Sequence, residues 1–178
     1  MSNTTGFEAF VVAHQDVVYA TAWRLLGNAT EAEDVAQEVF LKAFERYDQL
    51  AGSPAAVGWL RTVTRHACLN HLLRYRGRWQ FFSELTAPGE GAEAFDVASR
   101  TGNPATAYEA AERREHLGQA LLRLPDALRV PLVLYHFEDA SYQDISEMLG
   151  VSLAKVKTDI HRARKALKQH LTTDHGRR

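Results

Sequence analysis

The fold of this chain is decided by one stretch, residues 141–171, which reads SYQDISEMLGVSLAKVKTDIHRARKALKQHL. Ser141 and Asp144 have the spacing of a capping box, in which each side chain bonds the backbone N–H of the other residue. Gly150 follows the short helix that this box starts, where a tight turn favours a residue without a Cβ atom. Ser152 then supplies a second helix N-cap. The stretch therefore predicts two helices joined by a glycine turn.

The second of these helices combines an apolar face with a high density of positive charge. Its apolar residues recur at helical spacing, at Val156, Ile160, Ala163 and Leu167. Its cationic residues occupy the remaining faces, at Lys155, Lys157, Arg162, Arg164, Lys165 and Lys168. Two short helices, the second of them basic, are typical of a DNA-binding helix-turn-helix. An ordinary helical hairpin with a solvated charged face is the alternative interpretation.

Composition indicates a folded protein of one or two domains. The chain has 178 residues, of which 46% are apolar, and this is enough to form a core. Its apolar runs are far shorter than the roughly 20 residues of a membrane-spanning helix. Residues 1–6 are polar and lack the basic residues of a signal peptide. The single cysteine, Cys68, cannot form an internal disulfide, so we expect a cytoplasmic protein in a reducing compartment.

A net charge of −1 conceals a strong segregation of charge along the chain. Residues 31–38 hold four acids and no basic residue, whereas residues 57–78 hold five arginines and no acid. Residues 151–171 hold six lysines and arginines against one acid, Asp159. Two cationic segments predict two contacts with nucleic acid, and the acidic segment predicts a surface that faces a protein.

Helical periodicity covers most of the chain, and no strand alternation persists. A first helix runs through residues 7–25 to a C-cap at Gly27. A second begins at a capping box of Thr30 and Glu33, with Phe44 on its inner face. After a turn over residues 48–54, a third begins at Ser53–Pro54 and runs to about Tyr75, with apolar residues facing inward at Val57, Leu60, Val63, Ala67 and Leu72.

The segment 79–106 contains proline and glycine and has little periodicity, which favours a flexible linker. Helical signal returns over residues 107–124, and Pro125 starts the next helix. The fold class that we predict is all-α: two small helical domains, residues 1–78 and 107–173, joined by a linker at 79–106. The second domain contains the helix-turn-helix.

The third helix carries residues that suit DNA contact. Arginines can bind phosphates, asparagine can read a base edge, and an aromatic ring can stack on an unpaired base. The candidate residues are Trp59, Arg61, Arg65, Asn70 and Arg74. This combination suits partly single-stranded DNA. The alternative is an amphipathic helix whose tryptophan belongs to the core.

The sequence lacks the patterns of catalysis or cofactor binding. It contains no glycine-rich phosphate loop. His66, Cys68 and His71 are spaced so that a helix scatters them around its axis, and they cannot ligate one metal ion. Cys68 is instead expected to be a small core residue. We therefore expect no enzyme activity, no metal and no cofactor.

Taken in order, these segments resemble a bacterial extracytoplasmic-function (ECF) sigma factor. The resemblance covers residues 7–171 and is carried by EDVAQEVF at 33–40, GWLRTV at 58–63, LPDALR at 124–129, SYQDI at 141–145, and LGVS, VK and RAR within 149–164. It implies a promoter-specificity subunit that directs core RNA polymerase to −35 and −10 promoter elements and helps to melt the DNA. It also implies an anti-sigma factor that masks both domains.

The resemblance also implies roles for particular residues. Core polymerase would be bound by Asp34, Gln37, Glu38 and Phe40. The turn at 50–57 would capture a flipped base of the −10 element, and the −10 contacts would be Trp59, Arg61, Arg65, Asn70 and Arg74. The −35 element would be contacted by Ser152, Lys155, Lys157, Thr158, His161 and Arg162. Asp159 would either repel phosphate or accept a hydrogen bond from a cytosine amino group.

Two other functions compete with this one. A conventional helix-turn-helix regulator that acts without core polymerase would bind duplex DNA tightly by itself and would not use the arginines at 61–78. A helical adaptor protein with no DNA role would show no salt-dependent affinity for DNA.

Overall fold

The computed structural model describes residues 2–75 and 107–175, and every regular element within those ranges is an α-helix. The predicted all-α class is therefore confirmed. The chain divides into two compact units, residues 1–80 and 81–178, and each is described by itself. The predicted linker at 79–106 lies outside the described residues.

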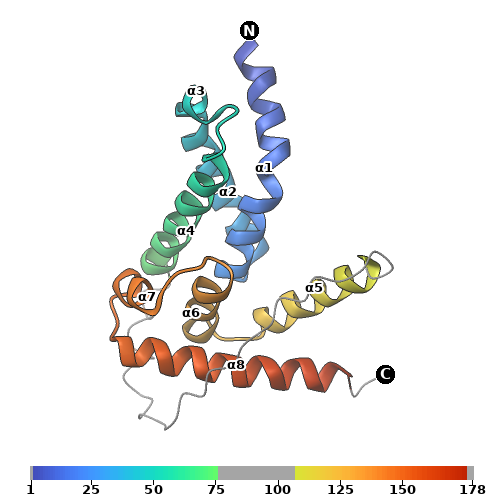
Figure 1. The fold of residues 1–178 in the computed structure, drawn as a ribbon, viewed down its shortest axis with the longest axis vertical. Coiled ribbons are helices and arrows are strands. Elements are labelled where there is room, and N and C mark those ends of the chain that lie inside the picture. Colours follow the sequence, from blue (N-terminus) through green and yellow to red (C-terminus); the bar gives the residue numbers. More distant parts are fainter. Residues whose placement is uncertain (1, 76–106, 176–178) are drawn as a thin grey trace. The chain divides into compact units, whose positions relative to one another are not determined.

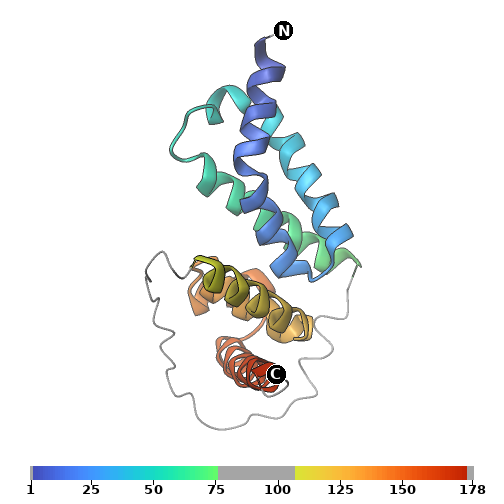
Figure 2. The same cartoon turned by 90° about the vertical axis from the view of Figure 1, so that its right-hand side faces the viewer.

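The first unit is a bundle of three long helices and one short one: α1 (Ser2–Leu26), α2 (Ala29–Glu45), α3 (Tyr47–Leu50) and α4 (Ala56–Tyr75). The three long helices each pack against the other two (Figures 1 and 2). They do so because apolar residues at helical spacing line their inner faces. The core includes Val18, Leu25, Leu26, Val39, Leu60 and Cys68, all 1% exposed or less.

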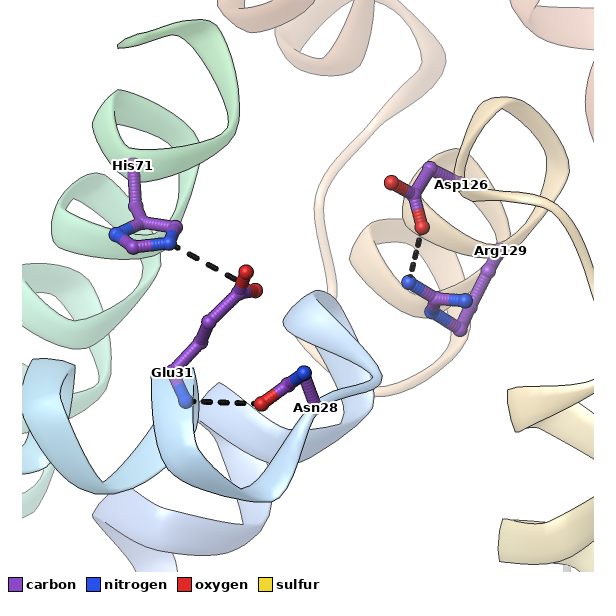
Figure 3. Close-up of polar contacts among 5 residues, drawn as sticks. All are labelled: Asn28, Glu31, His71, Asp126 and Arg129. Carbon is purple, nitrogen blue, oxygen red and sulfur yellow. Dashed lines mark hydrogen bonds and ion pairs between the residues drawn. The ribbon is translucent and has the colours of Figure 1, made fainter. Parts of the chain in front are cut away.

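Helix α2 begins earlier than the sequence predicted, because Asn28 rather than Thr30 is its N-cap. The Asn28 backbone is extended, and its side-chain oxygen accepts a hydrogen bond of 3.1 Å from the Glu31 N–H. The predicted Thr30–Glu33 capping box is therefore wrong. The Glu31 carboxylate instead lies 3.7 Å from the imidazole of His71 on α4, which links the start of α2 to α4 (Figure 3).

The predicted turn at 48–54 begins with one turn of helix, α3, and delays the start of α4. Ser53 accepts a 3.3 Å hydrogen bond from the Ala55 N–H, and α4 begins at Ala56 instead of Pro54. One inward prediction on α4 is wrong: Val57 is 40% exposed, whereas Ala56 is buried. The prediction that Phe44 faces inward on α2 is also wrong: it is 51% exposed and lies edge-on to the Phe7 ring at a centroid distance of 5.0 Å.

The second unit contains α5 (Ala107–Leu122), α6 (Asp126–His136), α7 (Tyr142–Leu149) and α8 (Leu153–His175). Helix α8 packs against each of the other three helices (Figures 1 and 2). The apolar face predicted for it is buried at Val156, Ile160 and Ala163. The core also contains Leu121, Leu124, Val130, Leu132, Leu134 and Ile145.

A buried arginine holds the start of α6. Arg129 is 3% exposed, donates a 2.9 Å hydrogen bond to the Leu124 carbonyl, and forms an ion pair with Asp126 (Figure 3). The contact to Leu124 crosses Pro125, so this one side chain ties the end of the α5–α6 connection to α6. Pro125 precedes the helix as predicted.

Candidate nucleic-acid and protein interfaces

The helix-turn-helix has the caps that the sequence predicted. The Ser141 hydroxyl accepts a 3.1 Å hydrogen bond from the Asp144 N–H, and the Asp144 carboxylate accepts one of 2.9 Å from the Ser141 N–H. Gly150 has a φ of 64°, in the left-handed region. The Ser152 hydroxyl accepts a 3.2 Å hydrogen bond from the Lys155 N–H. Both caps and the glycine turn are therefore confirmed.

Ser146 holds the turn with two hydrogen bonds that the sequence did not predict. Its hydroxyl donates a 2.6 Å hydrogen bond to the Val151 carbonyl, and its own carbonyl accepts one of 3.1 Å from the Val151 N–H. These two bonds join the last turn of α7 to the segment that leads into α8. A serine inside a short helix reads as an ordinary surface residue, so only the geometry reveals this role.

The candidate −35 residues of α8 differ in how much they present to solvent. Ser152 and Lys157 are exposed, whereas Thr158, His161 and Arg162 are partly buried. The Lys155 ammonium lies 2.5 Å from the Asp159 carboxylate, one helical turn along, and the Lys155 side chain is 20% exposed. Lys155 is thus tied to its own helix.

The expectation that Asp159 faces DNA is wrong. Asp159 is 6% exposed, and its carboxylate accepts from Lys155 on the same helix. The two residues are four apart, which is the spacing at which side chains on a helix meet. Burying a carboxylate is costly unless it has such a partner, so the ion pair with Lys155 stabilises Asp159 in its buried position.

Contacts of Arg164 and Tyr135 join α6, α7 and α8. Arg164 donates a 3.1 Å hydrogen bond from Nε to Nε2 of His136 and lies 5.5 Å from the centroid of the Tyr135 ring. Tyr135 stacks on Tyr142 of α7 at a centroid distance of 4.7 Å. Burial, and then the charge of Arg164, lower the pKa of His136 from its ordinary value of 6.5.

The exposed lysines of α8 are Lys157, Lys165 and Lys168.

The candidate −10 residues of α4 lie on two sides of the helix. Asn70 and Arg74 are exposed. Trp59, partly exposed, is eleven residues before Asn70, which is close to three helical turns and places the two on one side. Arg61 and Arg65 are partly buried on a different side, and Nε of Arg65 is buried without a hydrogen-bond partner. The structure therefore does not gather all five residues into one surface.

The acidic segment forms an exposed row along α2. Asp34, Gln37 and Glu38 are exposed, and Phe40 is partly buried. Glu38 forms a 2.6 Å ion pair with Lys42. Leu41 lies in the same row, at i+3 from Glu38 and i+4 from Gln37, and is 69% exposed. The sequence does not reveal that Leu41 is exposed, because a leucine in an amphipathic helix is ordinarily expected in the core.

No three His, Cys, Asp or Glu side chains of residues 2–75 and 107–175 converge in a way that could hold a metal ion. In the same part of the chain, no helix has the length and apolar character needed to cross a membrane.

The fold and these surfaces define a helix-turn-helix protein with a second, separate helical unit that exposes an acidic row. Comparison with protein families gives two matches: Sigma-70 region 2 over residues 10–78, and Sigma-70, region 4 over residues 114–167. Both matches follow the order of the two units along the chain.

The chain is also similar to whole sigma factors. It is 30% identical to the ECF RNA polymerase sigma factor SigW of Bacillus subtilis, over 93% of this chain and 88% of that protein. It is 33% identical to the RNA polymerase sigma-H factor of Pseudomonas aeruginosa, over 93% and 86% of the two chains. The chain belongs to the ECF family of sigma factors. It is therefore a promoter-specificity subunit that binds core RNA polymerase and promoter DNA, and a conventional regulator is excluded.

A solved structure supports the fold. The sigma factor RpoE of Bartonella quintana, in complex with the anti-sigma factor NepR, aligns with a TM-score of 0.50 at 24% identity, over 94% of this chain and 98% of that one. At this identity the likeness bears on the fold alone.

Proposed function

We propose that the two units share promoter recognition as follows. The first domain, residues 1–78, binds core polymerase through α2 and the −10 element through α4. The second, residues 107–173, binds the −35 element through α8. The observation that carries this assignment is the placement of exposed acidic and apolar groups on α2 and of exposed cationic groups on α4 and α8.

Core polymerase would bind the row Asp34, Gln37 and Glu38 on α2, with Phe40 at its edge. The acids suit a basic helical surface. Leu41 would supply the apolar centre, because it is largely exposed and lies among the polar residues of the row. An apolar residue inside a polar rim is the usual composition of a binding hot spot.

The −10 element would meet the exposed side of α4. Asn70 and Arg74 would contact bases and phosphates, and Trp59 would stack on an unpaired base. Arg61 and Arg65, on a different side of α4, would contact phosphates apart from this surface. The loop at 50–57 would hold a flipped base, whose extrusion costs a few kcal/mol of stacking that these contacts offset.

The −35 element would meet the start of α8, where Ser152, Lys157, Thr158, His161 and Arg162 lie. Lys155 would act chiefly through its ion pair with Asp159. We further propose that an anti-sigma factor binds this chain, as NepR binds the Bartonella quintana protein. The chain would have no enzymatic activity and would act in the cytoplasm, where RNA polymerase meets the chromosome.

The test is runoff transcription by core polymerase on a genomic promoter library. We expect initiation that depends on this chain. Replacing Asp34 and Glu38 together by alanine should weaken binding to core and leave promoter contacts of the assembled holoenzyme intact. Lys157→Ala should weaken promoter binding and leave core affinity unchanged. No initiation where a control sigma factor works, or exchanged phenotypes of the two variants, would contradict the proposal.

A further inference from the structure

The polar side chains at the start of α8 are already engaged within the helix. The Ser152 hydroxyl accepts from the Lys155 N–H, and the Thr158 hydroxyl donates a 3.0 Å hydrogen bond to the Ala154 carbonyl. The Lys155 ammonium pairs with Asp159. Three of the polar groups that the resemblance assigned to the −35 element thus already have one partner each inside their own helix.

Two of the exposed side chains in this turn are apolar. Leu153 is 38% exposed, and Ala154 is exposed beside it. Lys157 is also exposed and lies four residues after Leu153, which places both on one side of the helix. Val156 and Ile160, three and seven residues after Leu153, are buried, so Leu153 lies at the edge of the face that packs against the core. An isolated surface leucine is ordinary, but this one lies where the recognition helix begins and beside an exposed cation.

The major groove of B-DNA offers one apolar group, the C5 methyl of thymine. On the basis of the proposed function, we propose that Leu153 contacts a thymine methyl in the −35 element. Ala154 is small enough to let the helix approach the base edges. Lys157 binds a phosphate or the O6 and N7 acceptors of a neighbouring guanine. The start of α8 therefore selects sequence by apolar contact at one A·T pair as well as by charge.

The experiment uses holoenzyme and a promoter duplex obtained from the runoff library. Each thymine of the −35 region, on either strand, is replaced in turn by deoxyuridine, which lacks only the methyl group. We expect one replacement to lower the affinity of the wild-type holoenzyme about fourfold, the value of one buried methyl group. With Leu153→Ala, thymine and deoxyuridine at that position should bind equally.

Two further variants keep the result interpretable. Leu153→Met preserves an apolar side chain and should retain the preference for thymine. Val12→Ala removes a side chain that is 68% exposed on α1, and it should leave the thymine preference unchanged. Thermal unfolding of each variant checks that the fold is intact.

The inference is overturned if no deoxyuridine lowers affinity, if the −35 region contains no A·T pair, or if Leu153→Ala weakens thymine and deoxyuridine duplexes by the same factor. It is also overturned if Leu153→Ala alters only the binding of core or another protein. In each case the proposed function stands as long as unmodified promoters are bound and transcribed. Failure to bind the unmodified duplex would instead contradict the proposed function.

Discussion

At the scale of single residues, the contact between His136 and Arg164 makes the second unit sensitive to acid. Nε2 of His136 accepts a hydrogen bond from Arg164, which requires a neutral imidazole at that nitrogen. Burial and the charge of Arg164 hold the pKa of His136 below 6.5, so the unfolded chain takes up a proton at a higher pH than the folded chain does. The stability that this contact contributes is therefore present above pH 6.5 and is lost as pH falls below that value.

We predict that His136→Gln makes thermal unfolding less dependent on pH between about 7.5 and 5.5, the range in which an unperturbed histidine titrates. Unfolding is followed by circular dichroism at several pH values. His66→Gln, which removes an exposed histidine from the first unit, is the matched control for the loss of one imidazole. Equal pH dependence in wild type and His136→Gln would contradict the prediction.

At the scale of elements, the α7–α8 turn requires glycine at position 150 because of the backbone conformation there and not because space is short. Gly150 has a φ of 64°, and a Cβ atom added there would meet nothing within 4 Å. Gly150→Ala should therefore cost about 1 kcal/mol of unfolding free energy through backbone strain alone.

Gly58 also has open space around a Cβ but lies inside helix α4, without a positive φ. Gly58→Ala should stabilise the chain by about 0.5 kcal/mol. Urea unfolding measures both, and equal effects of the two substitutions would contradict the argument.

The long helices and the helix-turn-helix were predictable because local signals define them. The capping box at Ser141, the glycine at 150 and the apolar spacing of α8 each act within a few residues. Helix starts were harder, because Asn28 and Thr30 are both residue types that cap helices well, and the structure uses Asn28. The short helix α3, after which α4 begins only at Ala56, carries no strong local signal.

The sequence identified the helices that carry the candidate residues, but not how each side chain lies on its helix. Charge density predicts candidate surfaces on α2, α4 and α8, and these remain predictions. It could not show that Asp159 turns inward and holds Lys155, because a lysine and an aspartate four residues apart look the same in a sequence whether exposed or buried. It also could not show that Leu41 and Leu153 face outward, since that depends on which side of each helix the rest of the bundle covers.

At the scale of the whole molecule, the net charge of −1 would suggest weak attraction to DNA. Counterion release depends instead on the cations that lie at the phosphates. If Lys157 contacts a phosphate, Lys157→Ala should reduce the slope of log K against log salt for promoter binding by about 0.9. Asp34→Asn changes the net charge by the same amount in the opposite direction, but it lies on the row assigned to core polymerase. With saturating core polymerase, it should leave the slope unchanged. If net charge governed binding, Asp34→Asn would instead steepen the slope by as much as Lys157→Ala flattens it. Filter binding of the two variants over a range of salt concentrations therefore distinguishes a local phosphate contact from an effect of net charge.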